Sequence, residues 1–271
     1  FKNLFGIAKA KSEIINNISE NGTVVLNADD KFYNYLKLKA LKKKLKIISF
    51  SKKNKSNIKL EKITSFKNIS NLRINIYGKY KKFVIKRNIE PYLENVLAAI
   101  AVISDFMNLK NLSEKLFFNY NLPEGRGDSK YIKINNKKIN FTDESYNSNP
   151  LSLKFSLRKF DNIEVRSKKK IILLGDMLEL GKSSKKLHID AAKVLNNTNI
   201  NKVYVYGKNI IDTFNKIIPQ KRGRILHSKQ DILNFLINDI KSGDYLMIKG
   251  SNSTGLNTVA MNLKLGKINA I

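Results

Sequence analysis

Polar residues that could bind an anion or a nucleotide occur in four short segments of the second half of the chain. The segments are Asp143-Glu144-Ser145-Tyr146-Asn147, Gly175-Asp176-Met177, Gly207, and Lys249-Gly250-Ser251. Each follows a run of apolar residues, as a loop follows a buried strand. Backbone amides at the start of a following helix attract negative charge, and Lys249 adds a cation beside Gly250 and Ser251. Together the segments predict an anion or nucleotide site, although each alone is also typical of an ordinary strand-to-helix turn.

The elements around these segments alternate between strand and helix. The apolar pattern predicts strands at 139–142, 170–174, 202–206, 224–226 and 245–248, with helices near 150–160, 184–197, 208–218, 229–241 and 255–264. Such alternation implies right-handed crossovers and a doubly wound, mostly parallel, Rossmann-like sheet. In these sheets the ligand crevice lies beyond the carboxyl ends of the strands, which is where all four segments fall.

The first half of the chain is less regular but is also of the α/β class. Helical spacing of apolar residues predicts an amphipathic helix over 3–19 with Lys11 on its apolar face, and strands are expected at 23–26 and 47–50. Residues 58–86 suggest three edge-type strands, including 74–77 and 83–86. Pro91 is expected to open a helix over 92–107, and 112–119 is expected to form another short helix.

A loop rich in Pro and Gly, Asn121–Ser129 (NLPEGRGDS), marks the boundary between two domains, 1–122 and 123–271. The length of 271 residues is sufficient for two domains that each bury a core. The sequence contains neither a G-x-x-x-x-G-K-[ST] loop nor a G-x-G-x-x-G fingerprint. It therefore lacks a recognisable triphosphate cradle of its own.

The charge of the chain is strongly basic, with 51 Lys+Arg against 22 Asp+Glu and a formal net charge of +29. Lys, Asn and Ile share A/T-rich codons, so a base bias of the genome is sufficient to explain the charge; a polyanion-binding surface is the alternative. The absence of Cys excludes disulfides, zinc thiolates and iron–sulfur clusters, and two His leave little for a His-rich metal site. No export signal or membrane span is evident, and membrane insertion is not expected.

Several candidate residues also have a structural interpretation. Asp143 and Glu144 are adjacent on a strand end and should point to opposite faces. One of them could accept hydrogen bonds from ribose hydroxyls, or cap the helix that follows. A lone His such as His188 is more often a packing residue than a catalyst.

Four blocks of the sequence, in order, resemble the Mur ligases of peptidoglycan synthesis. They are GIAKAKSEI (6–14) with NADD (27–30); NVLAA (95–99); GRG (125–127) with DESYNSNP (143–150); and LGDMLELG (174–181) with His188 and KGS (249–251). The resemblance implies the back half of a central ATPase domain followed by a Rossmann-like carboxyl-terminal domain. It also implies an ATP-dependent, cytoplasmic enzyme, a monomer, that joins D-alanyl-D-alanine to UDP-N-acetylmuramoyl-tripeptide through an acyl phosphate. The chain alone is expected to be inactive.

The same resemblance assigns roles residue by residue. Lys11 matches a lysine that is carbamylated and helps to hold Mg²⁺; Asn95 matches a residue that meets adenine, and Arg126 an arginine that reaches the ATP phosphates. Asp143 and Glu144 are expected near the ribose. The acceptor's side of the cleft is expected to be lined by Tyr146, Asn147, Asn149, Lys249 and Ser251. The chain departs from many relatives at Pro91, where a His is common, and at Asn252, Leu256 and Asn257.

Two other classes of function fit parts of the sequence. One is a basic α/β module that binds nucleic acid, although no specific nucleic-acid partner is expected. The other is a free-standing nucleotide-binding Rossmann domain with another activity. Binding of labelled nucleic acid across a salt series separates the first of these from the ligase.

Overall fold

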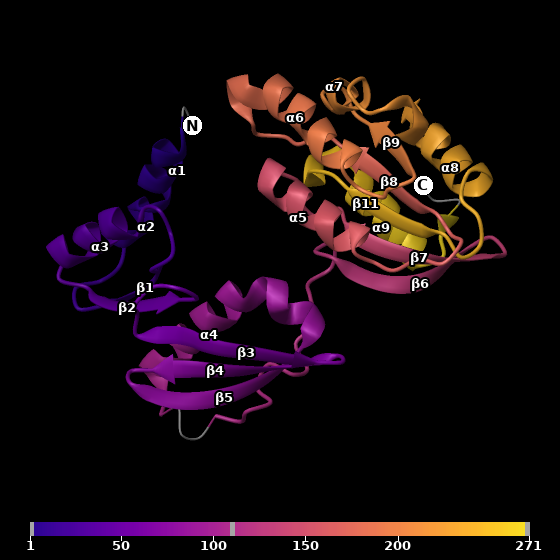
Figure 1. Cartoon of the computed structure of the whole chain (residues 1–271). Helices are drawn as coiled ribbons and strands as arrows, with labels where there is room; N and C mark the ends of the chain where they lie inside the picture. Colours follow the sequence, from indigo (N-terminus) through magenta and orange to yellow (C-terminus); the bar gives the residue numbers. More distant parts are fainter. Residues whose placement is uncertain (1–2, 109–111, 269–271) are drawn as a thin grey trace. The chain divides into compact units, whose positions relative to one another are not determined.

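The structure, a computed structural model, describes residues 3–108 and 112–268. It separates into two compact units, Phe1–Asn121 (unit 1) and Leu122–Ile271 (unit 2), coloured indigo to magenta and magenta to yellow in Figure 1. Both units are α/β, as the sequence predicts, and each contains a sheet of its own. Among the described residues no helix is long and apolar enough to cross a membrane.

Unit 1 begins with two short helices rather than the single helix predicted over 3–19. Helix α1 (Leu4–Lys11) ends at Ser12, and α2 (Glu13–Asn16) follows directly. The buried side of the pair consists of Ala8, Ser12 and Ile15, whereas Lys11 is exposed. The expectation of a continuous helix with Lys11 on its apolar face is therefore wrong. The buried Ser12 hydroxyl donates to the Lys9 carbonyl, and this local bond competes with regular helix geometry.

The sheet of unit 1 combines parallel and antiparallel strands in the order β1-β2-β3-β4-β5. Strands β1 (Thr23–Asn27), β2 (Lys46–Ser51) and β3 (Ile58–Phe66) are parallel, with α3 (Tyr33–Lys42) between the first two along the chain. Strands β3, β4 (Ile69–Ile76) and β5 (Lys79–Lys86) form an antiparallel meander, which confirms the three strands predicted in 58–86. Of these three, only β5 lies at the edge of the sheet.

Helix α4 (Leu93–Phe106) packs across β1 to β3 and buries an apolar stripe against them. Pro91 does not open it but lies inside a preceding 3₁₀ helix, Arg87–Tyr92. The helix predicted over 112–119 is wrong, because residues 114–119 form turns. The Glu114 carbonyl accepts a hydrogen bond from the Val84 amide of β5 (2.8 Å). Because the Glu114 carbonyl is bonded to the edge strand of the sheet, it does not accept a hydrogen bond within a local helix.

Unit 2 is built around a six-stranded sheet in the order β10-β9-β8-β11-β7-β6. Strands β7 (Lys137–Glu144), β8 (Lys170–Gly175), β9 (Lys202–Tyr206), β10 (Arg222–Leu226) and β11 (Tyr245–Lys249) are parallel, and only β6 (Asp128–Ile134) is antiparallel. The mostly parallel sheet is therefore confirmed. Strand β6 was not predicted, because four of its seven residues are exposed and no helix separates it from β7.

Helices cover both faces of this sheet, as in a doubly wound fold (Figure 1). One buried cluster joins the sheet to α8 (Lys229–Asn238) and α9 (Leu256–Lys264). A second cluster joins it to α5 (Pro150–Asp161), α6 (Ser184–Asn196) and α7 (Ile210–Phe214). Helix α7 is much shorter than the predicted 208–218. Apolar burial on both faces explains why the strands are continuous apolar runs in the sequence.

Candidate functional site

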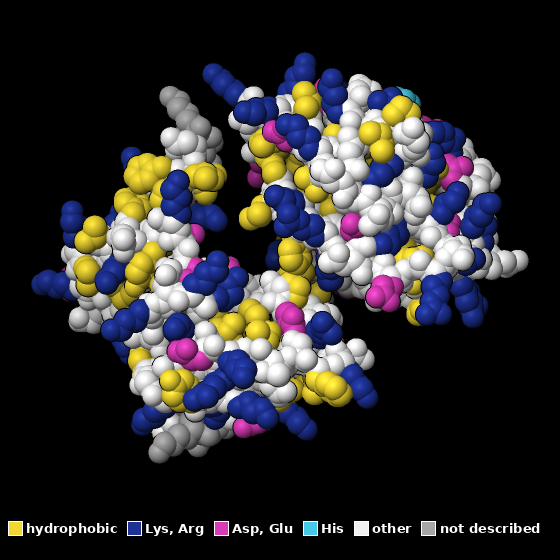
Figure 2. All heavy atoms as spheres, in the orientation of Figure 1, with side chains coloured by type: hydrophobic (Ala, Val, Ile, Leu, Met, Phe, Trp, Pro, Cys, Tyr) yellow, Lys and Arg dark blue, Asp and Glu magenta, His cyan; other side chains and the backbone are white. Residues whose placement is uncertain are grey.

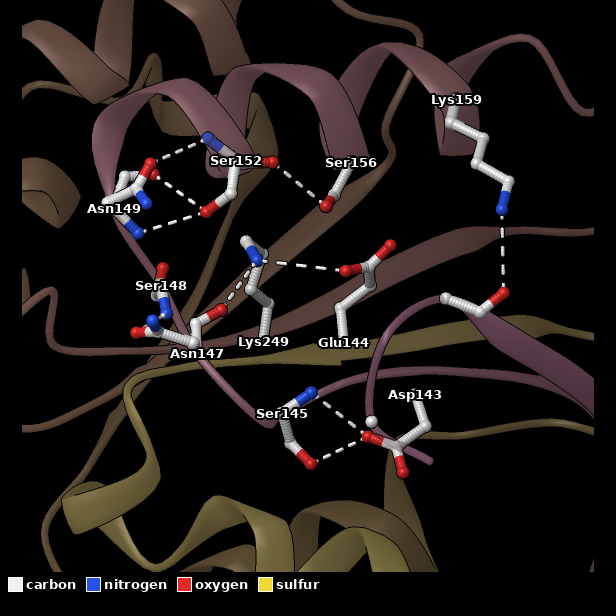
Figure 3. Close-up of polar contacts among 12 residues, drawn as sticks. Asp143, Glu144, Ser145, Asn147, Ser148, Asn149, Ser152, Ser156, Lys159 and Lys249 are labelled. Carbon is white, nitrogen blue, oxygen red and sulfur yellow. Dashed lines mark hydrogen bonds and ion pairs between the residues drawn. The ribbon is translucent and has the colours of Figure 1, made fainter. Parts of the chain in front are cut away.

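A buried ion pair lies at the carboxyl ends of two neighbouring strands of unit 2. Glu144 ends β7 and Lys249 ends β11, and the two are paired in the register of these strands. Lys249 Nζ lies 3.8 Å from Glu144 Oε2, and the lysine side chain is only 1% exposed (Figure 3). Burial raises the pKa of Glu144 and lowers that of Lys249, while the charge of each partner opposes these shifts.

Lys249 also fixes the backbone of the loop between β7 and α5. Its ammonium group donates to the Asn147 carbonyl (3.0 Å), and Figure 3 shows the side chain pointing between this carbonyl and Glu144. Asn149 ends the loop as the N-cap of α5, where its side chain and that of Ser152 form a capping box. Both predicted residues therefore have structural contacts that hold the loop.

Ser251 joins this loop to the one that follows β8. Its hydroxyl donates to the Ser148 carbonyl (3.2 Å) and accepts from the Leu178 amide (2.9 Å). Its own amide donates to the Asp176 carbonyl (3.0 Å). Three of the four predicted polar segments thus meet at the carboxyl edge of the sheet.

Asp143 points away from Glu144, as strand alternation predicts, and its carboxylate is engaged on both sides. Oδ1 accepts from the Ser145 amide (3.0 Å) and hydroxyl (2.6 Å), while Oδ2 lies 2.5 Å from Lys264 Nζ. Lys264 comes from α9, and it also binds Asp128 at 2.8 Å. Burial lowers the pKa of Lys264, but the two carboxylates prevail and raise it. Sequence reasoning missed Lys264 and Asp128, since nothing in their local pattern distinguishes them.

The loop that carries Arg126 is held against the 143–146 segment. Gly125 has φ +72°, and a Cβ there would lie 2.9 Å from the Cβ of Tyr146. The Gly125 amide donates to Asp128 Oδ1 (2.9 Å), and its carbonyl accepts from the Tyr146 amide (3.1 Å). Arg126 is exposed, with its guanidinium carbon 4.6 Å from the centroid of the Tyr146 ring. The close approach requires glycine and presents a cation beside the site.

The Gly207 segment is tied to the site through Asp176. The carboxylate accepts from the Lys208 amide (3.2 Å) and the Ile210 amide (2.7 Å), and it lies so close to Gly207 that a Cβ would clash with it. His188 is fully buried; Nε2 accepts from the Met177 amide at 3.1 Å. His188 therefore supports the loop after β8, in agreement with its structural interpretation.

Two hollows open at this edge of the sheet. The smaller has a volume of about 280 Å³ and is lined by Tyr146, Asn147, Leu178, Glu179, Ser251, Asn252 and Ser253. The larger, of about 420 Å³, shares Leu178 and Ser253 and adds residues from the ends of β9 and β10, among them Lys208 and His227. Sequence reasoning did not single out Lys208 or His227. Hollows at this position are the expected ligand sites of an open α/β sheet.

The two remaining predicted site residues, Lys11 and Asn95, belong to unit 1. Lys11 is the last residue of α1, and Asn95 lies in the first turn of α4; both are exposed. The described residues contain no group of three His, Cys, Asp or Glu side chains that could hold a metal ion. Unit 1 therefore does not offer a complete metal site from its described side chains.

Unit 2 thus has the fold of a Rossmann-like, doubly wound α/β domain. Two family models match the chain: the Mur ligase middle domain over residues 1–103, and the Mur ligase, glutamate ligase domain, over residues 131–252. The chain belongs to the Mur ligase family.

Named relatives agree with this assignment. The UDP-N-acetylmuramoyl-tripeptide–D-alanyl-D-alanine ligase of Buchnera aphidicola subsp. Baizongia pistaciae is 30% identical over 267 residues, covering 97% of this chain and 55% of that protein. A crystal structure of MurF from Acinetobacter baumannii matches 99% of this chain and 56% of its own with a TM-score of 0.74 and 21% identity. MurF ligase from Thermotoga maritima, in complex with ADP, has a TM-score of 0.71 and 19% identity, covering 99% and 60%. The chain thus spans about half the length of the curated relatives it matches.

Proposed function

We propose that this chain contributes to an ATP-dependent amide ligase that joins D-alanyl-D-alanine to UDP-N-acetylmuramoyl-tripeptide. The observation that carries the proposal is the match of nearly the whole chain to a relative of that name, with the two family models in order along the chain. The geometry supports it, because the segments of unit 2 that are most typical of the family meet around one pair of hollows. The family resemblance implies a cytoplasmic enzyme, and the monomeric state stays a prediction.

The proposed reaction has two steps. The terminal carboxylate of the tripeptide takes the γ-phosphoryl group, leaving ADP and an acyl phosphate. The amine of D-alanyl-D-alanine then attacks the acyl carbon, loses a proton, and expels inorganic phosphate as the amide forms. Both steps develop negative charge on oxygen, so fixed cations and amide donors would stabilise their transition states.

The residues of unit 2 divide into those that would touch ligands and those that position them. Arg126, exposed and stacked on Tyr146, is suited to bind the ATP phosphates. Tyr146 and Asn147 line a hollow of about 280 Å³, which can hold part of a dipeptide. Lys249 is buried and bonded, so we assign to it and its partner Glu144 the role of positioning the loop rather than direct contact with substrate.

The assignments to the other buried or unit 1 residues remain proposals based on the family. Asp143 is buried with both carboxylate oxygens engaged, so contact with the ribose would require it to exchange a bond to Ser145 or Lys264. Lys11 as a carbamate would supply an oxygen ligand of the kind Mg²⁺ prefers. Asn95 is exposed, so its side chain is accessible for contact with adenine.

The test uses a chimera in which residues 1–271 are joined to the part of the Buchnera relative that this chain does not match. Mass spectrometry should detect the amide product only when ATP, the UDP-linked tripeptide and D-alanyl-D-alanine are all present. The 271-residue chain alone should give no product, because its sequence contains no triphosphate-binding loop.

Two matched variants sharpen the test. Arg126→Ala should lower the turnover of the chimera by about 10²–10³-fold, as expected when a donor to a charged transition state is lost. Arg166→Ala, which removes an exposed arginine from the loop before β8, should leave turnover within about twofold. Turnover by the 271-residue chain alone, or a folded chimera that prefers another acceptor, would contradict the proposal.

A further inference from the structure

The antiparallel part of the unit 1 sheet has one face packed on the core and one exposed face. On β4, Ser70, Leu72, Ile74 and Ile76 are buried, and the residues between them face the other way. The register places the exposed face, which we call the meander face, on the following residues: Lys59, Lys62, Thr64 and Phe66 of β3; Ile69, Asn71, Arg73 and Asn75 of β4; and Tyr80, Lys82, Val84 and Lys86 of β5. It carries five cations, and its one carboxylate, Glu61 in the bulge beside Lys62, is paired with Lys59.

Three of these cations lie directly opposite one another across three strands. Lys62 is paired with Arg73, and Arg73 with Lys82. All three are exposed, and among the described residues none forms an ion pair with a carboxylate. The only acidic residue of the three strands, Glu61, lies 3.6 Å from Lys59. Like charges directly opposite on adjacent strands are destabilising. A bound anion would reduce the repulsion within this row.

A shallow hollow follows the same row. It has a volume of about 140 Å³ and is lined by Lys62, Thr64, Asn71, Leu72, Arg73 and Lys82. The surface of the hollow itself is mainly apolar, and the ends of its lining side chains carry ammonium, guanidinium, hydroxyl and amide donors. Adjacent strands lie about 4.8 Å apart, so the three cations span roughly 10 Å and can contact successive phosphates of one chain.

Exposed aromatic rings flank the cation row on both sides. Tyr80 is 58% exposed, and the Arg73 guanidinium carbon lies 4.2 Å from its ring centroid. Phe66 is 66% exposed at the other end of the face. Bases stack on exposed aromatic rings and on guanidinium planes, and β-sheet faces are common platforms for such stacking. Figure 2 shows Lys and Arg side chains gathered over this part of unit 1.

We propose that the meander face binds single-stranded nucleic acid without sequence specificity. The sugar–phosphate backbone lies along Lys62, Arg73 and Lys82, and unpaired bases stack beside Tyr80 and Phe66. The meander face shares no residue with those assigned to ligation, so the proposal goes beyond the proposed function and does not depend on it. Exposed rings on both sides of the row favour a single strand over a duplex, whose bases are already stacked.

The experiment measures fluorescence anisotropy of a labelled oligo(dT) of about 20 nucleotides with the full 271-residue chain over a salt series. The variant Lys62→Gln/Arg73→Gln/Lys82→Gln should bind about 100-fold more weakly at about 0.1 M salt. Its slope of log K against log salt should fall by about 2, because three phosphate contacts are lost at about 0.7 each. Tyr80→Ser should weaken binding by about tenfold or more without changing the slope.

The control Lys42→Gln/Lys53→Gln/Lys55→Gln removes the same charge from exposed positions outside the meander face. It should bind within about threefold of the parent chain. Both triple variants should melt no lower than the parent, since exposed substitutions cost little and the first relieves repulsion.

Three outcomes would overturn the proposal. In the first, both triple variants weaken oligo(dT) binding equally, which would indicate that the charge acts diffusely. In the second, the parent chain shows no salt-dependent binding of oligo(dT). In the third, the Lys62→Gln/Arg73→Gln/Lys82→Gln variant alone loses binding to phosphatidylglycerol vesicles while its oligo(dT) binding is unchanged.

Discussion

Replacement of Lys249 by Met tests whether the buried pair holds the site together. The substitution keeps the volume of the side chain but leaves Glu144 buried without its cation, and it removes the donor to the Asn147 carbonyl. Breaking a buried pair by removing one partner costs about 3–5 kcal/mol. For a unit of this size, about 2–4 °C per kcal/mol gives a fall of about 6–20 °C in the melting temperature of unit 2.

The loss should depend on pH in a defined direction. Burial raises the pKa of Glu144 above its ordinary 4.5, and removal of Lys249 takes away the charge that opposes this shift. A carboxyl whose pKa is higher in the folded state stabilises the fold below 4.5 and loses that contribution as pH rises through its folded pKa. The deficit of Lys249→Met relative to the parent should therefore be larger at about pH 7.5 than at about pH 5.

Calorimetry at the two pH values measures the deficit, and hydrogen exchange read by mass spectrometry locates it in residues 143–150. The loss of unfolding free energy in the double variant Glu144→Gln/Lys249→Met should be smaller, by at least about 2 kcal/mol, than the sum of the losses in the two single variants Glu144→Gln and Lys249→Met. Lys154→Met, an exposed lysine of α5, is the control and should change stability by less than about 0.5 kcal/mol. A Lys249→Met chain as stable as the parent at pH 7.5, or additive single losses, would refute the reasoning.

Two further predictions concern the framework of unit 2. Lys221 Nζ donates to the Leu195, Asn196 and Thr198 carbonyls at the end of α6, so Lys221→Met should cost about 1–3 kcal/mol in denaturant unfolding; an unchanged midpoint would contradict this. Burial and the nearby Asp239 raise the pKa of Tyr204 to about 12, so ultraviolet titration should show one late tyrosine that is absent from Tyr204→Phe. Because the pKa of Tyr204 in the folded state exceeds its ordinary value of 10, the contribution of its phenol to the free energy of unfolding should be lost between about pH 10 and 12.

The fold of unit 2 could be predicted because its parallel strands are buried on both faces. Runs such as Lys170–Gly175 are apolar without alternation, and each is followed by a turn and an amphipathic helix. The errors occur where tertiary contacts override the local pattern. In unit 1 the Glu114 carbonyl is taken by the sheet edge, and the buried Ser12 interrupts a helix that the apolar spacing favoured.

The position of the candidate site could also be predicted, but not the roles of its members. Strand ends with polar residues identify the edge where ligands bind. Whether a particular side chain is free to bind depends on partners distant in the sequence, such as Lys264 for Asp143 and Glu144 for Lys249. No local pattern encodes these pairs. The sequence therefore indicated a set of candidates, and the structure shows which of them are engaged in holding the loops.

The basic residues of the chain occur in two distinct structural arrangements. In unit 2, lysines from other segments donate to carbonyls at the ends of three helices: Lys170 to α5, Lys221 to α6 and Lys137 to the Ile237 carbonyl of α8. A cation at a helix carboxyl terminus interacts favourably with the negative end of the helix dipole and donates to carbonyls that lack helical partners. These lysines therefore stabilise the fold without a bound ligand. On the meander face three cations, Lys62, Arg73 and Lys82, instead lie opposite one another across strands. A base bias of the genome supplies lysines to both places, but only the second arrangement costs stability in the absence of an anion. A function for the charge is therefore to be sought on that face rather than in the net charge.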